Sequence, residues 1–374
     1  MKPYPISWSS VRGAMLLVGL LIVLPVLVAC QAQSASPTAS AATSEPPSAG
    51  ETEEPSVAPS LAPVAPVSFG VLRAPTGALA VVTDEQGWYE EAGVEVEFNS
   101  FAEGGGPAII QAMGGGEPDI ALLNLATVVL ALGQGTFDVE IVSVAADPAE
   151  ALPLIATEEI LTVEDLRGKR VSSPPSGGLY YVLAATLAKF GMTFDDIDYR
   201  PLAVGEAQAA FVTGELDAVV SSANGAVIIQ ETVPGSHVLF DGTMFDPEDN
   251  YASPDVIIAT REAVENNPEG ISRFLQAFHG QGVPYLNDSA THEEAIAAIQ
   301  EYMTSVGAGL EEIESTTKSV EAIEFYDLET ATELLGSDNF RSALDAQIQF
   351  WIDTGAFEEA PDLEGVLNTE LIAQ

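Results

Sequence analysis

Small and polar residues follow the predicted strands of this chain, and their chemistry is that of hydrogen bonding to a ligand. The clearest case is the segment 162–192, TVEDLRGKRVSSPPSGGLYYVLAATLAKFGM. A strand over 169–173 leads into a loop of proline, serine and glycine, and apolar residues then recur at helical spacing. A helix N-terminus behind such a loop presents N–H groups that have no partner within the helix. The candidate ligand-binding residues here are Ser173, Ser176, Gly177 and Gly178.

Gly177 has two interpretations at this stage. The absence of a Cβ lets a ligand approach the backbone closely, and it also lets the residue adopt a positive φ in the turn after Pro175. Both remain open.

Other loops qualify by the same reasoning, because ligands of open α/β sheets bind beyond the carboxyl ends of the strands. The loops are 73–77, 101–107, 123–127, 204–206 and 221–224, and their candidates are Arg73, Thr76, Gly77, Gly105, Asn124, Thr127, Ser222 and Asn224. Arg73 is either a charge partner for an acidic ligand or a surface or interlobe salt bridge. Glu103 and Glu206 instead favour a ligand that carries an amine or a ring N–H.

Motifs for catalysis are missing from these loops. The sequence has no GxSxG elbow, no Walker A loop and no HExxH, and the loops contain no paired acid and base. A single cysteine excludes an intrachain disulfide and a cysteine-cluster metal site, and the three histidines are far apart in sequence. We therefore predict a binding protein with no catalytic residue, no cofactor and no metal site.

The elements that position these loops alternate between strand and helix, which predicts an α/β fold with parallel β–α units. From Arg261 onward the pattern predicts helices to the end. We expect residues 338–357 to pack on a first lobe, the unit that begins with the strand at 67–73, with Trp351 in the core. The predicted strands are 67–73, 94–100, 119–124, 138–146, 152–157, 169–173, 198–204, 217–222, 237–242 and 252–260, the last of them returning to the first lobe.

The first 66 residues predict targeting and tethering instead of a folded unit. Residues 1–30 begin with Lys2 and Arg12 and continue with an apolar run, as a signal peptide does. Residues 31–66 are rich in Ser, Ala, Thr, Pro and Glu, which predicts a disordered tether.

The composition is strongly acidic. Lys and Arg number 12 and Asp and Glu number 56, for a net charge of −44. Such a surface disfavours nucleic acid and anionic lipid as partners, and it also suits a salt-rich medium.

The order of these motifs resembles a family of bacterial solute-binding proteins, the one that serves importers of sulfonates, nitrate, taurine and thiamine-pyrimidine precursors. The motifs are LTVEDLRGKRV with the glycine loop and LAKFGM, EQGWYEEAGVEVEFNSF with GGGPAIIQAMGGGEPDIALLN, EAQAAFVTGELDAVV, and NNPEGISRFLQAFHGQGVPYLN. The resemblance implies a bilobed, periplasmic-binding-protein type II-like fold with a hinge. It places lobe 1 at 67–148 plus 253–374 and lobe 2 at 149–252.

The same resemblance implies a monomer that binds a small molecule and passes it to ABC permease subunits. LVAC at 27–30 resembles the lipobox of bacterial lipoproteins, which implies a lipid on Cys30 and attachment to the extracytoplasmic face of the membrane. Two alternatives remain, an enzyme like the thiamine-pyrimidine synthases and a ligand-sensing receptor lipoprotein. Ser176 with two glycines, and Ser221 with Ser222, depart from the pattern of sulfonate-binding members, which disfavours a taurine-like ligand and leaves room for a larger or flatter one, such as a pyrimidine or a flavin-like heterocycle.

Overall fold

The computed structural model describes residues 64–102, 104–135, 137–246 and 251–374. Cys30, the predicted signal peptide and the predicted tether as far as residue 63 lie outside the described residues, and so does Glu103.

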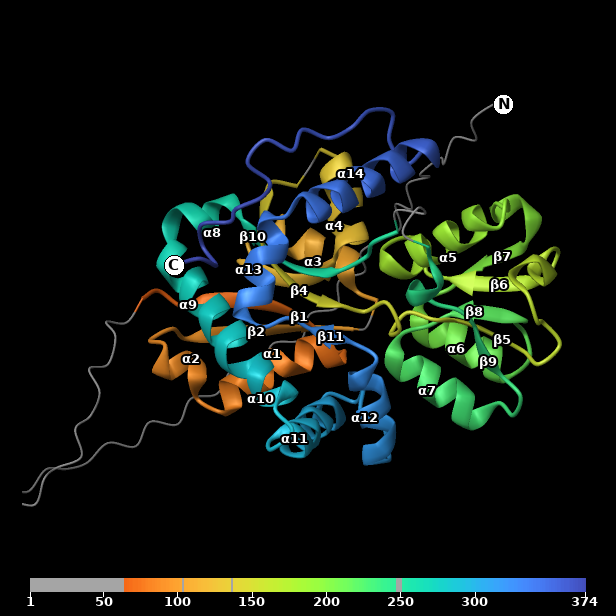
Figure 1. Cartoon of the computed structure of the whole chain (residues 1–374), viewed down its shortest axis with the longest axis horizontal. Coiled ribbons are helices and arrows are strands. Elements are labelled where there is room, and N and C mark those ends of the chain that lie inside the picture. The colour runs from red at the N-terminus through yellow and green to blue at the C-terminus, as the bar shows by residue number, and fades with distance from the viewer. Residues whose placement is uncertain (1–63, 103, 136, 247–250) are drawn as a thin grey trace, which may run out of the picture. The chain divides into compact units, whose positions relative to one another are not determined.

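The first sheet is mixed and has the strand order β11-β4-β10-β3-β1-β2 (Figure 1). β1 pairs in parallel with β2 and β3, whereas β10 is antiparallel to both β3 and β4. The strands are β1 (Val67–Leu72), β2 (Val96–Phe101), β3 (Ile120–Asn124), β4 (Val139–Asp147), β10 (Asp255–Thr260) and β11 (Glu324–Phe325).

The second sheet is also mixed, with the order β7-β6-β8-β5-β9. β6 is parallel to β7 and β8, and β5 is antiparallel to β8 and β9. The strands are β5 (Leu154–Ala156), β6 (Arg170–Ser173), β7 (Asp198–Pro201), β8 (Ala218–Val220) and β9 (His237–Phe240).

The α/β class is confirmed, but the prediction of parallel sheets is wrong for β5 and β10. Each of these is the first strand after the chain passes from one sheet to the other. The chain leaves one sheet at the carboxyl ends of its strands and enters the other sheet at the carboxyl ends of that sheet's parallel strands. The entering strand therefore runs antiparallel to its neighbours. β10 follows all strands of the second sheet along the chain and pairs within the first sheet, as predicted for 252–260.

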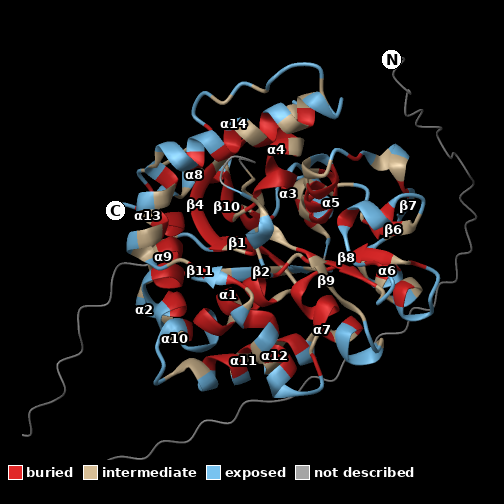
Figure 2. Ribbon diagram, turned by 45° about the vertical axis from the view of Figure 1, so that its right-hand side comes forward, coloured by how far each residue is buried: buried red, intermediate tan, exposed pale blue. Residues whose placement is uncertain are grey.

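Helices cover the first sheet and enclose one continuous apolar core, whose buried strands and helix faces Figure 2 shows in red. They are α1 (Pro75–Glu85), α2 (Trp88–Glu91), α3 (Gly106–Met113), α4 (Leu125–Gly133), α8 (Arg261–Asn266), α9 (Pro268–Ala277), the π-helical η5 (Phe278–Gly282), α10 (Val283–Asn287), α11 (His292–Ser305), α12 (Ile313–Glu321), α13 (Leu328–Gly336) and α14 (Asp338–Asp353). The C-terminal part is not wholly helical, because β11 joins the edge of the sheet and residues beyond Asp353 run without a helix.

The second sheet is covered by α5 (Gly178–Lys189), α6 (Val204–Val212) and α7 (Ala223–Thr232), with short 3-10 turns η1 (Val163–Leu166), η2 (Phe194–Asp196) and η3 (Gly242–Met244). Local signals in the sequence explain their ends. Thr162 and Asp165 form a capping box at η1, and Gly191 follows α5 with a φ of 65°.

Two helices of the C-terminal part also contact the second sheet's helices. On one side, Asn224 of α7 accepts a hydrogen bond at 2.5 Å from Ser319 of α12. On the other side, Tyr180 of α5 stacks on Trp351 of α14 with ring centroids 5.8 Å apart. Trp351 is buried, as predicted, and its helix α14 therefore packs on α5 as well as on α4 of the first sheet.

Candidate functional site

A cavity of about 120 Å³ lies where the carboxyl ends of the strands of both sheets meet. We call the residues that the first sheet's elements contribute the first wall and those that the second sheet's elements contribute the second wall. The first wall is Leu72, Ala74, Pro75, Thr76, Gly104, Gly106, Pro107, Leu122, Leu123, Asn124, Thr127, Asp255 and Ile323. The second wall is Pro174, Ser176, Gly177, Gly178, Leu179, Ser222 and Ala223, and Pro148, Ala151 and Leu152 complete the lining from the crossing between the sheets.

The N-terminal ends of α1, α3, α4, α5 and α7 all contribute lining residues. Two of these ends are capped by side chains, because Asn124 accepts from the N–H of Ala126 at 3.2 Å and Ser222 accepts from that of Gly225 at 3.3 Å. The ends of α1, α3 and α5 have no side-chain cap. The first turns of α1 and α3 each contain a proline, which has no N–H, whereas the first turn of α5 has none, so α5 leaves the most N–H groups for a ligand.

Seven predicted residues line the cavity: Thr76, Asn124, Thr127, Ser176, Gly177, Gly178 and Ser222. They come from both sheets and from four separate helix N-termini. The strand-end rule thus brings residues together that are up to 146 positions apart in sequence, from Thr76 to Ser222 (222 − 76).

Five predicted residues are not among the lining residues, and each has a structural contact instead. Arg73 donates from Nη1 to the carbonyl of Val306 at 3.2 Å and from Nε to that of Phe101 at 3.4 Å. Gly77 packs α1 so closely on β1 that a Cβ would lie 2.2 Å from the carbonyl oxygen of Leu72. Gly105 is the N-cap of α3.

The other two fix loops of the second sheet. Ser173 donates to the carbonyl of Pro174 at 3.0 Å. Asn224 donates to the carbonyl of Ala308 at 3.1 Å and accepts from Ser319, so its amide joins α7 to the α12 region. Glu206 is exposed on α6 and is not a lining residue.

The walls approach each other at two adjacent glycines. Gly177 has a φ of 82° and a ψ of −165°, a conformation that few residues other than glycine adopt, and a Cβ there would lie 3.1 Å from Thr127 Oγ1. A Cβ at Gly178 would lie 2.8 Å from Cγ and Oδ1 of Asn124. Gly177 therefore serves the turn, and both glycines also allow close approach of the walls.

Asp255 is a lining residue that the strand-end rule missed. It begins β10, and because β10 is antiparallel its first residue lies opposite Asn124, at the carboxyl end of β3. Asp255 is 9% exposed and accepts from Asn124 Nδ2 at 3.2 Å. Burial raises its pKa to about 7, and nearby Asp147 adds to that increase while the Asn124 hydrogen bond opposes it. An aspartate at the start of an apolar strand was the signal in the sequence.

Two threonine hydroxyls of the first wall are free to bind a ligand. Thr76 and Thr127 are 6% and 8% exposed, and neither hydroxyl makes a hydrogen bond to another described residue. Neither oxygen is among the fully buried, unpartnered polar atoms of the described residues, so both are accessible and available to a ligand in the cavity.

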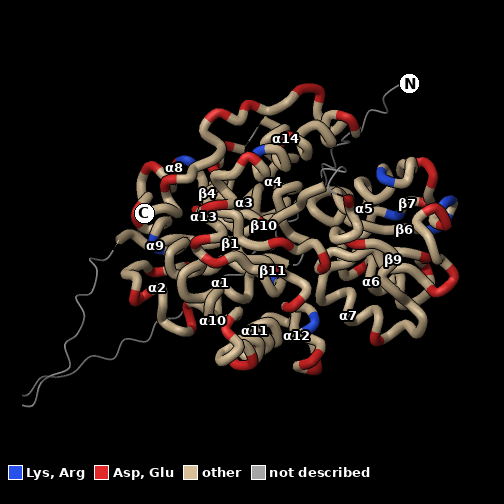
Figure 3. Tube along the Cα trace, in the orientation of Figure 1, with Lys and Arg blue, Asp and Glu red and all other residues tan. Residues whose placement is uncertain are grey.

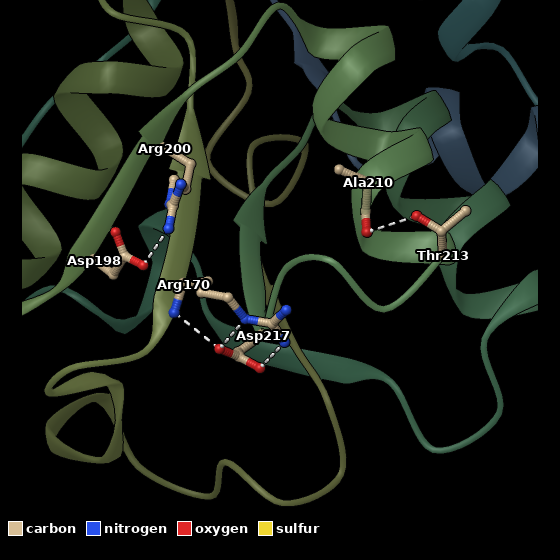
Figure 4. A network of polar contacts seen from close by, with 6 residues as sticks. All are labelled: Arg170, Asp198, Arg200, Ala210, Thr213 and Asp217. Atoms are coloured by element: carbon tan, nitrogen blue, oxygen red, sulfur yellow. Dashed lines mark hydrogen bonds and ion pairs between the residues drawn. The ribbon is translucent and has the colours of Figure 1, made fainter.

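Cationic side chains lie away from the cavity. Figure 3 shows Lys and Arg scattered among many Asp and Glu, and among the described lining residues there is no Lys, Arg or His. In the second sheet, Arg170 bonds Asp217 through Nη2 at 2.6 Å and Nε at 3.0 Å, next to the Arg200–Asp198 pair (Figure 4). Arg170 begins β6, so this network lies at the end of the sheet opposite the cavity.

A serine–histidine pair elsewhere in the first sheet's core has no access to a substrate. His279 is fully buried, with Nδ1 2.7 Å from the carbonyl of Tyr326 and Nε2 2.7 Å from Ser143 Oγ. Because a carbonyl only accepts, Nδ1 carries the proton and Nε2 accepts from the serine. Burial lowers the pKa of His279 to about 4, which keeps the ring neutral. The pair is a satisfied packing contact.

No helix within the described ranges has both the length and the apolar character that crossing a lipid bilayer requires. This finding concerns the part from residue 64 onward.

Comparisons with known proteins agree with this architecture. Binding proteins of Brucella abortus are 28% identical over 222 residues, which is 59% of this chain and 66% of theirs, so the match spans just under two thirds of these relatives. An aliphatic sulfonates-binding protein of Escherichia coli is 27% identical over 46% of this chain and 53% of its own. The crystal structure of the periplasmic aliphatic sulphonate binding protein of Escherichia coli matches with a TM-score of 0.67 at 18% identity, covering 82% of this chain and 92% of that one.

The structural match establishes that the fold is that of periplasmic binding proteins. The sequence model described as NMT1/THI5 like matches residues 75–287, more than half of the chain, and this range includes every predicted ligand-binding residue except Arg73, which follows β1. The chain belongs to the NMT1/THI5 like family.

Proposed function

We propose that this chain is an extracytoplasmic solute-binding protein that delivers a small organic molecule to an ABC importer. The observation that carries the proposal is the cavity between the two walls, which is lined by uncapped helix N-termini and by two threonines whose hydroxyls have no partner among the described residues. These groups bind a ligand without reacting with it. The relatives named above are themselves described as binding proteins.

Two walls from two sheets also suit capture by closure. We propose residues 67–148 plus 253–374 as lobe 1 and 149–252 as lobe 2, with the crossings near Asp147–Leu152 and Tyr251–Asp255 as the hinge. Ligand enclosed between the lobes excludes water from the helix N-termini, which strengthens each hydrogen bond there.

The lining chemistry favours binding over the enzyme alternative. Among the described lining residues there is neither a histidine nor a cysteine, so the hydroxyls of Thr76, Thr127, Ser176 and Ser222 have no imidazole base beside them. A calorimetric titration of the mature chain should find one bound ligand per chain. Mass spectrometry should then recover that ligand chemically unchanged, and recovery of a converted product would favour an enzyme.

Delivery to an importer is tested in cells. Uptake of the bound compound should require both this chain and an ATP-driven permease. A chain that binds its ligand tightly but does not affect uptake would instead support the receptor alternative.

We further propose that Cys30 carries a lipid that attaches the chain to the membrane, since LVAC at 27–30 matches a lipobox. The variant Cys30→Ala should remain uncleaved by the lipoprotein peptidase and unlabelled by a fatty-acid probe. Undiminished labelling of the variant would refute the anchor without affecting the binding proposal.

A further inference from the structure

Asp255 holds an acceptor that the protein itself does not use. Its Oδ1 accepts from Asn124 Nδ2, and Oδ2 makes no hydrogen bond within the described residues, although the side chain is 9% exposed and lines the cavity. A carboxylate accepts through both oxygens, so one oxygen of this buried group is left for another donor.

The hydrogen bonds of Asn124 fix that geometry. Asn124 Oδ1 accepts from the Ala126 N–H at 3.2 Å and from Ser253 Oγ at 2.8 Å, which assigns the nitrogen to the other side of the amide. Nδ2 donates to the carbonyl of Ser253 at 2.7 Å and to Asp255. Both ends of the amide are occupied, so Asn124 cannot turn to satisfy the second oxygen of Asp255.

No cation of the described chain neutralises Asp255. The described arginines and lysines are absent from the cavity lining, and Arg73, which stands beside lining residues Leu72 and Ala74 in the sequence, donates away from it to backbone carbonyls. The charged neighbour from β4 is Asp147, which has the same sign. A buried carboxylate without a cation is costly, so Asp255 on its own favours the protonated form, and a cationic ligand would stabilise the ionised form instead.

The space around Asp255 is small and mostly apolar. Leu72, Leu122, Leu123, Leu152 and Leu179 contribute to the lining of this partly open cavity of about 120 Å³. A dry cavity of ~150 Å³ is known to hold benzene, so a single ring or a short chain fits this one. That size favours one small ring over a flavin-like ring system.

We propose that Asp255 is a ligand-binding residue that receives a positively charged N–H group, an ammonium or an amidinium, on an apolar body the size of one ring. This inference rests on the proposed binding function and narrows its ligand class. The free oxygen of Asp255 accepts the N–H, the apolar lining holds the body, and the uncapped ends of α1 and α5 remain for any acceptor that the ligand carries.

The test uses matched compounds on the same carbon skeletons. Ethyl to hexyl chains and cyclohexyl and phenyl rings are each tested as the ammonium or amidinium, the neutral amide and the sulfonate, against the mature full chain by calorimetry. The cationic members should bind best and the sulfonates worst. Asp255→Asn should weaken the best cationic binder roughly tenfold or more, because a charge-assisted hydrogen bond is lost.

Asp119→Asn is the matched control. Asp119 is a partly buried acid of the first sheet's region that directly precedes β3, at the opposite end of that strand from Asn124, and it is not among the lining residues. Its variant should bind the same cation within about twofold of the unmodified chain. Circular dichroism and thermal melting of both variants establish that each is folded.

Three results would contradict the proposal, and they separate it from the binding function. If sulfonates bind best and Asp255→Asn leaves or strengthens their binding, the ligand class is wrong while the binding function stands. If the two variants weaken the cation equally, Asp255 acts through general charge and not by contact. If no compound of any class binds below about 1 mM, both the ligand class and the binding function fail.

Discussion

The two walls of the cavity differ in the groups that they offer to a ligand. The first wall contributes side chains with a fixed direction, namely the carboxyl of Asp255, the amide of Asn124 and the hydroxyls of Thr76 and Thr127. The second wall contributes mostly glycine, proline and backbone around the N-terminus of α5, with Ser176 and Ser222. In the proposed binding function, the first wall would therefore select the chemistry of the ligand, and the second wall would set how closely it is enclosed.

The electrostatic energies of the two walls can be compared to decide which sign of charge a ligand group near Asp255 should carry. One helix N-terminus favours an anion by roughly 0.3–1 kcal/mol. A carboxylate and an anionic group ~5 Å apart repel by about 3 kcal/mol at an effective dielectric constant of 20. Above the pKa of Asp255, about 7, its ionised carboxylate therefore outweighs any single helix end beside it, and below that pKa the protonated carboxyl does not.

The largest expected loss of stability comes from removing the aromatic contact between α14 and α5, the helix whose N-terminus forms part of the second wall. Trp351 of α14 stacks on Tyr180 of α5, whose N-terminus forms that wall, and it is 2% exposed. Trp351→Ala should lower the free energy of unfolding by about 3–5 kcal/mol, the usual cost of truncating a buried large aromatic residue. Ligand affinity should fall as well, because α5 loses its position relative to the first wall.

Trp88→Ala controls for the loss of a tryptophan as such. Trp88 packs edge-on against Tyr285 at 5.2 Å, within the first sheet's helices. Chemical denaturation should show a smaller loss of stability, and calorimetry should show unchanged affinity. Equal losses of affinity in the two variants would mean that α14 does not hold the second wall in place.

The second effect is the pH dependence of stability, which has opposite signs for Asp255 in the first wall and for His279 in the core of the same sheet. Burial raises the pKa of Asp255 from 3.8 to about 7, so the folded chain holds a proton that the unfolded chain has released, and stability is lost as pH rises across that window. Burial lowers the pKa of His279 from 6.5 to about 4, so the unfolded chain takes up the proton first and stability is gained as pH rises across that window. Each group changes the free energy of unfolding by at most about 1.4 kcal/mol per pH unit.

The unmodified chain combines these two opposite dependences of unfolding free energy on pH, and variants of Asp255 and His279 should separate them. Relative to that chain, Asp255→Asn should become progressively more stable as the pH rises from 4 to 7. His279→Gln should become progressively less stable relative to it as the pH rises from 4 to 6.5. Urea unfolding at a series of pH values measures both differences, and parallel profiles for all three chains would contradict the assignments.

A third, smaller effect concerns the second wall's backbone. Gly177→Ala should cost about 1–3 kcal/mol of stability because of its φ of 82° and ψ of −165°. A Cβ would also press against Thr127 Oγ1, so the variant should bind ligand more weakly than its stability loss explains. Valine at this position is a poor test, since its branched side chain adds strain to a backbone that already disfavours it.

Gly191→Ala is the control for positive φ alone. Gly191 has a φ of 65° with open space around its Cβ position, and it lies at the opposite end of α5 from the cavity. Its stability should fall while ligand affinity stays unchanged. If both alanine variants keep full affinity, the Gly177 loop is not part of the binding site.

Much of the fold could be predicted from the sequence because local signals were strong. The strand–loop–helix segment around Ser173 and Gly178, the capping box at Thr162 and the glycine after α5 are set by nearby residues. The return of β10 to the first sheet was also recognised, from an apolar strand following the second lobe.

Strand direction accounts for the residue that was missed. The strand-end rule searches for ligand-binding residues only after each strand, which assumes that every strand ends at the cavity. β10 begins at the cavity instead, so the rule does not find Asp255. The hydrogen-bonding partners of Asn224 come from residues 84 and 95 positions away. A pattern of local spacing contains no information about such distant partners, so a polar side chain that joins two helices looks the same in sequence as one that faces a ligand.

The smallest expected effect is at Arg73, the one cation next to the first wall in the sequence. Its guanidinium donates to the carbonyls of Val306 and Phe101, and these bonds turn it away from the lining residues beside it. Arg73→Ala should therefore lower the free energy of unfolding by about 1 kcal/mol, through the lost hydrogen bonds, and change ligand affinity by less than about twofold. Arg73→Lys keeps the charge but not both bonds, so it separates charge from positioning. Calorimetry with the best cationic and the best sulfonate compound measures both. If the alanine variant loses sulfonate binding tenfold while the lysine variant keeps it, Arg73 supplies charge to the ligand, and the first wall would then select anions through this residue and not cations through Asp255.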